Sequence, residues 1–174
     1  LVGHNAIRTR VMGLADRAPT APELARMQAL VEEGMRDGAF GLSTGLRYIP
    51  GFYSATDEVV ALSRVAAARG GIYTSHLREE GLGLFEGVGE AIRIGREARI
   101  PIVLTHHKAI GKAMWGQSVR TLAMVDSARA AGIDVMIDQY PYTASQTGLS
   151  VLIPPWALAD GDRSEEHTSE LQSH

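Results

Sequence analysis

The sequence of 174 residues contains no cysteine, which excludes disulfide bonds and thiolate metal ligands from this chain. It has no apolar run of the roughly 20 residues that a membrane-spanning helix needs. Neither sign of charge dominates, since 17 basic residues stand against 20 acidic ones. This balance predicts neither nucleic acid nor a membrane as a partner. Any metal ion bound by this chain would depend on histidine and carboxylate ligands.

The two ends of the sequence indicate a piece of a longer reading frame. The first residue is leucine rather than methionine, and residues 163–174 (RSEEHTSELQSH) match the translation of a common sequencing adapter. We therefore expect residues 1–162 to be the native part and residues 163–174 to be a non-native tail that takes no part in the fold. A cytoplasmic location is expected, with any signal peptide lying upstream of Leu1.

Helical and β-rich segments alternate along the chain. The spacing of apolar residues predicts helices over 21–37, 56–69, 88–99 and 118–131, and strands over 39–42, 72–75, 102–105 and 134–138. Thr20 with Glu23 fits a capping box for the first helix, and Thr56 is expected to cap the second. Residues 43–52 are predicted to form a site-lining loop.

This alternation is typical of an α/β fold with a parallel sheet and right-handed crossovers. The strand ends recur every 30 to 33 residues, the length of one βα unit. Polar loops follow every strand and no G-x-G-x-x-G follows the first one, which favours a barrel over a doubly wound sheet. A complete barrel takes roughly 250 residues. We therefore predict a partial TIM (β/α)8 barrel of about four to five βα units.

Two of the β-rich runs end alike, on a hydroxyl residue followed by histidine. Residues 72–76 (IYTSH) end at His76, and residues 101–108 (PIVLTHHK) carry His106 one βα unit later. Parallel strands lie roughly 4.8 Å apart and end at the same edge of the sheet, so these imidazoles could share one metal ion. The pattern predicts a metal site, and the alternative is two histidines hydrogen-bonded to protein at the rim.

Further polar side chains follow at the same edge. If the strand continued past His106, His107 would point away as a structural residue and Lys108 would return to the face of His106. Lys108 could meet an anionic substrate group, or it could be a solvated lysine. Residues 138–145 (DQYPYTAS) place an acid and several hydroxyls after the next strand, where they could orient a carboxylate or serve a structural role.

Together these motifs resemble those of the N-acyl-D-amino-acid deacylases (D-aminoacylases), a family of the metal-dependent amidohydrolase superfamily. The resemblance extends over essentially all of residues 1–162. It rests on the order and spacing of LVGHNAIR at 1–8, GLSTGL at 41–46, YIPG at 48–51, SHLR at 75–78, THHK at 105–108, YPYTAS at 140–145 and PPW at 154–156.

The resemblance implies that His76 and His106 bind Zn2+ and that Lys108, Tyr140 and Ser145 hold the carboxylate of a small N-acyl-D-amino-acid substrate. It implies hydrolysis of the substrate amide to a carboxylate and a free D-amino acid. The family pattern also includes an early His-x-His pair, a bridging cysteine and an aspartate general base after the last barrel strands. None of these is in this sequence. The catalytic base is therefore expected beyond the C-terminal end, and the chain alone is expected to be inactive.

Two alternatives stay open. A cyclic amidase of the dihydroorotase or hydantoinase type would use the same rim for a ring amide, with a lysine ligand in place of the cysteine. A non-catalytic barrel would bind a carboxylated metabolite and use His76 and His106 only for hydrogen bonds within the protein. His4, in the first motif, is expected to make a structural hydrogen bond.

Overall fold

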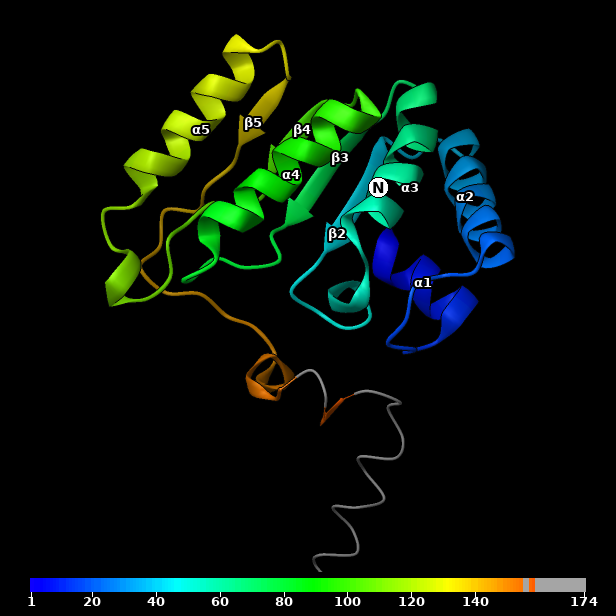
Figure 1. Ribbon diagram of the computed structural model, residues 1–174, viewed down its shortest axis with the longest axis horizontal. Coiled ribbons are helices and arrows are strands. Elements are labelled where there is room, and N and C mark those ends of the chain that lie inside the picture. Colours follow the sequence, from blue (N-terminus) through cyan, green and yellow to red (C-terminus); the bar gives the residue numbers. More distant parts are fainter. Residues whose placement is uncertain (155–156, 159–174) are drawn as a thin grey trace, which may run out of the picture.

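The computed structural model of the protein describes residues 1–154 and 157–158, in which strands and helices alternate (Figure 1). The strands are β1 (Val2–Gly3), β2 (Gly41–Gly45), β3 (Ile72–His76), β4 (Ile102–Leu104) and β5 (Val135–Ile137). The α-helices are α1 (His4–Met12), α2 (Ala21–Arg36), α3 (Thr56–Ala68), α4 (Leu84–Ala98) and α5 (Ser118–Ala130). Short 3-10 helices are η1 (Gly51–Tyr53), η2 (Lys112–Met114) and η3 (Leu149–Leu152).

Two sequence predictions concern residues beyond this description. The predicted non-native tail, residues 163–174, lies outside the described residues, as do Pro155 and Trp156 of the last motif. Among the helices that the structure describes, none is both long enough and apolar enough for a bilayer crossing.

The strands of the described residues form one parallel sheet in the order β1-β2-β3-β4-β5. Every connection therefore runs to the next strand in the same direction. Because such crossovers are right-handed, a constant direction puts the helices on one face of the sheet. Figure 1 shows α2, α3, α4 and α5 as neighbours along that face. In a doubly wound sheet the strand order reverses partway, so that helices cover both faces. The predicted α/β fold, part of a (β/α)8 barrel, is confirmed.

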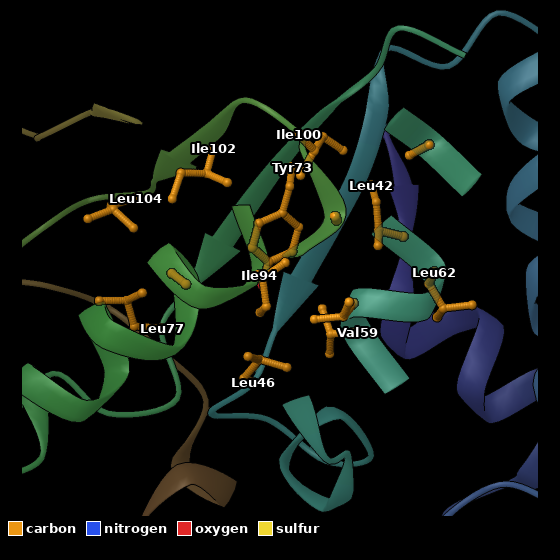
Figure 2. Close-up of a cluster of buried hydrophobic side chains, with 14 of the residues drawn as sticks. Leu42, Leu46, Val59, Leu62, Tyr73, Leu77, Ile94, Ile100, Ile102 and Leu104 are labelled. Carbon is orange, nitrogen blue, oxygen red and sulfur yellow. The ribbon is translucent and has the colours of Figure 1, made fainter. Parts of the chain in front are cut away.

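The hydrophobic core lies between the sheet and this layer of helices (Figure 2). Leu42, Tyr73 and Ile102 project from β2, β3 and β4 toward α3 and α4 and are completely buried. Alternate strand positions lie on the opposite face, where Met136 of β5 is 45% exposed. His76 follows Tyr73 by three positions, so its side chain belongs to this second face, away from the helices.

A small polar cluster explains why β2 is longer than predicted. Thr44 was expected in a loop, but β2 pairs with β3 as far as Gly45. The buried Thr44 hydroxyl lies 2.8 Å from the Tyr73 hydroxyl and donates to Ser75 Oγ at 3.0 Å. Burial raises the pKa of Tyr73 to about 12, so this phenol stays protonated. These polar groups can be buried under the helices because they form hydrogen bonds with one another.

The predicted start of α2 is confirmed and that of α3 is one residue off. Thr20 and Glu23 form the reciprocal capping box at the start of α2, with bonds of 2.7 and 3.4 Å. Thr56 is the first residue of α3 and does not cap it, because Ala55 occupies the N-cap position. The Thr56 hydroxyl instead donates to Glu90 of α4 at 2.8 Å.

Helix α4 begins at Leu84, four residues before the predicted start. Glycines at this end of the helix have low helix propensity, which favoured the later start. The structure gives Gly87 a packing role, since a Cβ built on it would lie 2.7 Å from the carbonyl oxygen of Glu79. The absence of a side chain lets α4 press against the loop that follows β3. Tertiary contact therefore overrides local propensity here.

A buried charged cluster connects α1 to α3. His4 Nε2–H donates to Oε1 of Glu58 at 2.8 Å, and the Arg8 guanidinium donates to Oε2 of the same carboxylate. Arg8 also donates to the carbonyl of Arg17 at 2.7 Å. Burial raises the pKa of Glu58, but the hydrogen bonds from His4 and Arg8 outweigh it, so the pKa lies below its usual value. The predicted structural hydrogen bond of His4 is confirmed.

Candidate metal and substrate site

The structure brings His76 and His106 together at the carboxyl edge of the sheet. β3 and β4 are neighbours, with Ser75 paired to Leu104. His76 is the last residue of β3, and His106 follows β4 by two residues. Their ring centroids are 4.3 Å apart, and Nδ1 of His76 is in direct contact with Nε2 of His106. One nitrogen of each ring is therefore directed at the same point.

A turn in the backbone orients His106. Its φ of 43° lies in the left-handed region, which histidine enters more often than most residues other than glycine. Asp138, after β5, holds the turn: its carboxylate accepts a hydrogen bond from the His106 N–H at 2.5 Å, and its carbonyl accepts one from the His107 N–H at 2.9 Å. The strand does not continue past His106, because β4 ends at Leu104, one residue before the predicted end at Thr105.

His107 nevertheless points away from the pair, as predicted. Its ring is buried, and its Nε2 lies 2.7 Å from Oγ1 of Thr121 in α5. Desolvation lowers the pKa of His107, so the ring stays neutral at physiological pH. This histidine connects the loop after β4 to the helix layer and takes no part in the cavity wall.

Lys108 and Glu80 flank the other edge of the His106 ring. Nζ of Lys108 lies 2.7 Å from Nδ1 of His106 and donates to Oε1 of Glu80 at 2.7 Å. Oε1 of Glu80 is also 3.0 Å from Nδ1 of His106. The three side chains are only 17 to 22% exposed, so solvent weakly screens the interaction between Lys108 and Glu80. Lys108 faces His106 as predicted, whereas the sequence assigned Glu80 no role.

The histidine pair opens onto a cavity of about 740 Å³, a size usual for small-molecule sites. The Tyr140 ring borders the cavity at 6.4 Å from the His106 ring, and Lys108 Nζ lies 5.6 Å from its centroid, within cation–π range. Ser145 lines the same cavity on an exposed segment after β5. All the residues predicted to form the site therefore surround one cavity.

The loop after β2 supplies the facing wall. The sequence predicted a site-lining loop here but singled out no residue in it. Arg47 and Tyr48 line the cavity, and the Tyr48 ring meets the His76 ring edge-on at 6.2 Å. Arg47 pairs with Glu79 at 3.0 Å, which connects this loop to the one after β3. The composition of residues 43–52 was the available signal, and it could not indicate which side chains face inward.

Arg78, in the SHLR motif, anchors that loop. Its guanidinium donates to the carbonyls of Phe52 at 2.7 Å and Ser54 at 2.9 Å. It also binds both carboxylate oxygens of Glu90 in α4, at 2.9 and 2.8 Å. The planar fork of arginine suits such simultaneous contacts better than the point charge of lysine. The end of β3 therefore fixes both His76 and the loop that faces it.

The surroundings of His76 favour its neutral form. Desolvation, followed by the charge of His106, lowers the pKa of His76, and the opposing attraction of Glu80 is smaller. A neutral imidazole keeps the lone pair that a metal ion needs.

The two imidazoles suit zinc but do not complete a site. A catalytic zinc takes three protein ligands and keeps one position open. Within residues 1–154 and 157–158, no group of three or more His, Cys, Asp or Glu side chains is placed to hold a metal ion. His76 and His106 can thus supply two ligands, and a third would have to come from outside the described residues.

No protein-family model matches the chain. Curated relatives do match it: an N-acyl-D-glutamate deacylase is 44% identical over 154 residues, and a D-aminoacylase is 42% identical over 149 residues, both from Alcaligenes xylosoxydans xylosoxydans. The alignments cover 88% and 86% of this chain, but 31% of each relative. The chain therefore spans about a third of the length of the curated relatives it matches.

Solved structures agree with these relatives. One is a crystal structure of D-aminoacylase, described as defining a novel subset of amidohydrolases, with 40% identity and a TM-score of 0.79. Another is N-acyl-D-glutamate deacylase from Bordetella bronchiseptica, complexed with zinc and a phosphonate mimic of the tetrahedral intermediate, with 42% identity and a TM-score of 0.79. Each superposition covers 82% of this chain and 30% of the other. The resemblance predicted from the sequence is confirmed.

Proposed function

We propose that this chain, a homologue of the N-acyl-D-amino-acid deacylases of the amidohydrolase superfamily, carries part of the active site of a zinc-dependent enzyme that hydrolyses N-acyl-D-amino acids. The observation that supports this most directly is the convergence of His76 Nδ1 and His106 Nε2 at the carboxyl edge of the sheet. A barrel keeps its chemistry at this edge.

In this proposal, His76 and His106 hold the metal together with ligands from outside the described residues. A bound zinc ion polarises a substrate carbonyl and lowers the pKa of a water molecule toward neutrality. The low pKa of His76 keeps its ring available as a ligand. The aspartate general base that the resemblance implies is not assigned to any residue of this chain.

Three side chains around the cavity are proposed to hold the substrate carboxylate. Lys108 supplies a charged donor, and Tyr140 and Ser145 supply hydroxyl donors. Hydrogen bonds from charged donors to carboxylates are roughly twice as strong as neutral ones, so Lys108 should contribute most. Fixing the carboxylate on one side and the amide at the histidine pair would help set the chirality accepted, with the cavity wall around the substrate side chain as the third contact that selection of one hand requires.

The proposal is tested by removing the metal from the enzyme that contains this chain and restoring zinc. Hydrolysis of N-acetyl-D-amino acids should disappear and return, while N-acetyl-L-amino acids should remain uncleaved throughout. Amino-acid release followed by chiral chromatography measures this. Turnover of hydantoin or dihydroorotate in place of the linear amide would favour the cyclic amidase, and a purified enzyme free of zinc would favour the non-catalytic barrel.

The 174-residue chain assayed alone is expected to release no amino acid. It supplies two of the zinc ligands, and in the described sheet β1 and β5 are open edges that a closed barrel would pair. Zinc-dependent turnover by a monomeric, cooperatively melting preparation of the chain would contradict this.

Replacing Lys108 with methionine should raise KM by about 10- to 100-fold, because a charged hydrogen bond to a buried partner contributes about 1.5–3 kcal/mol. Methionine keeps much of the side-chain volume, and Tyr140 keeps its neighbour. Steady-state kinetics with an N-acetyl-D-amino acid measures the change, and bound zinc should stay at the wild-type level. An unchanged KM would show that Lys108 does not hold the carboxylate.

A further inference from the structure

Nδ1 of His106 has two neighbours whose effects on the ring are opposite. Glu80 Oε1 lies 3.0 Å away and can only accept a proton, whereas Lys108 Nζ lies 2.7 Å away and, as an ammonium, can only donate one. The neutral imidazole carries one proton, so the partner that Nδ1 binds decides which nitrogen keeps the lone pair.

The two choices differ in their consequence for a metal ion. If Lys108 donates to Nδ1 of His106, the ring proton resides on Nε2, and the nitrogen that faces His76 has no lone pair to offer. If Glu80 accepts from Nδ1–H, the lone pair resides on Nε2, at the point where the two rings converge. Carboxylates play this part beside metal-bound histidines in many proteins.

The backbone contacts of Glu80 hold its carboxylate beside Nδ1 of His106, where it competes with Lys108. Its carbonyl accepts from the Ile110 N–H at 2.8 Å, which attaches it to the loop that carries His106. Its own N–H donates to Oε1 of Glu79 at 2.9 Å, and this loop is pressed against α4 at Gly87. Its side chain is 17% exposed. The carboxylate therefore has little freedom to leave His106.

We propose that Glu80 is a positioning residue that fixes the His106 tautomer with Nε2 free for the metal ion. Lys108 donates to the same Oε1 at 2.7 Å, so one carboxylate serves both side chains. The inference rests on the proposed function, because it assigns the role of Glu80 within that same zinc site.

The first test measures the zinc dissociation constant by competition with a chromophoric chelator, in the enzyme that contains this chain. Glu80→Leu removes the acceptor and should weaken zinc binding by about 10- to 100-fold, the usual effect of losing such a partner. Glu80→Gln keeps a neutral acceptor oxygen and should lie between Leu and wild type. Glu86→Gln removes an exposed carboxylate six residues away and should leave the constant unchanged.

The second test reads the tautomer directly, by long-range ¹H–¹⁵N NMR on histidine-labelled, zinc-free enzyme. The wild-type His106 should carry its proton on Nδ1, and Glu80→Leu should move it to Nε2. An Nε2–H form in the wild type, or a dissociation constant within twofold of wild type for Glu80→Leu, would overturn the role of Glu80 while leaving the proposed function intact. Failure of the wild-type enzyme to bind zinc would overturn the proposed function itself.

Discussion

Replacing His76 or His106 with alanine should remove zinc from the enzyme that contains this chain and lower kcat/KM by about 10³-fold or more. The structure directs one nitrogen of each ring at a common point, so the loss of either leaves the ion with one fewer strong ligand. A catalytic metal contributes several kcal/mol to transition-state stabilisation, and about 1.4 kcal/mol corresponds to a tenfold change in rate. Metal analysis and steady-state kinetics measure the two effects.

His107 provides the matched control, because it is adjacent in the sequence to His106 but bonds Thr121 in the helix layer. His107→Asn should lower the unfolding midpoint and retain the full complement of zinc. Wild-type zinc content in both the His76 and the His106 variants would exclude these residues as ligands.

Replacing Glu58 with alanine should destabilise the protein by about 3–5 kcal/mol, because it leaves the charge of Arg8 buried without a counter-ion. Arg8 is completely buried and Glu58 is 4% exposed, so neither can turn to water. The cluster also joins α1 to α3 through His4. Denaturant unfolding monitored by circular dichroism measures the loss. The matched control is Glu97→Gln, which breaks a partly exposed pair with Arg93 in α4 and should cost under about 1 kcal/mol.

The same carboxylate should make stability depend on pH in the acid range. The folded-state pKa of Glu58 lies below its ordinary value of 4.5, so its contribution is fully present above about pH 4.5 and is lost as the pH falls through the folded pKa. The neutral variant Glu58→Gln cannot titrate, and the difference in stability between it and the wild type should shrink on acidification. A difference that stayed constant from pH 7 down to pH 3 would contradict the assignment.

The sequence predicted the fold better than the boundaries of its elements. Apolar spacing and the Thr20–Glu23 capping box located α2, because a capping box is formed by two residues only three positions apart in the sequence. The start of α4 was misplaced because its glycines are explained by contact with the loop after β3, a partner that local pattern does not contain. Thr44 was expected in a loop for the same reason, since its bonds go to Tyr73 and Ser75 of the next strand.

The candidate site was likewise predictable from the sequence only in part. His76 and His106 could be paired from the sequence because each follows a strand, and parallel strands end at one edge. The carboxylates of Glu80 and Asp138 could not be predicted as partners of His106, since each lies about 30 positions from it in the chain. The turn at His106 could not be predicted either, because Asp138 holds it.

By itself, the sequence determined the alternation of strands and helices, the direction of the sheet and the edge at which the two imidazoles meet, because these follow from periodicity and chirality within short segments. The tertiary structure alone decided which nitrogen of each ring faces the other, which carboxylate borders His106 and which arginine holds the facing loop. Such choices depend on which side chains of distant segments come within hydrogen-bonding distance and become buried together. A hydrogen bond depends on the distance between its two atoms in space, which the order of residues in the chain does not give.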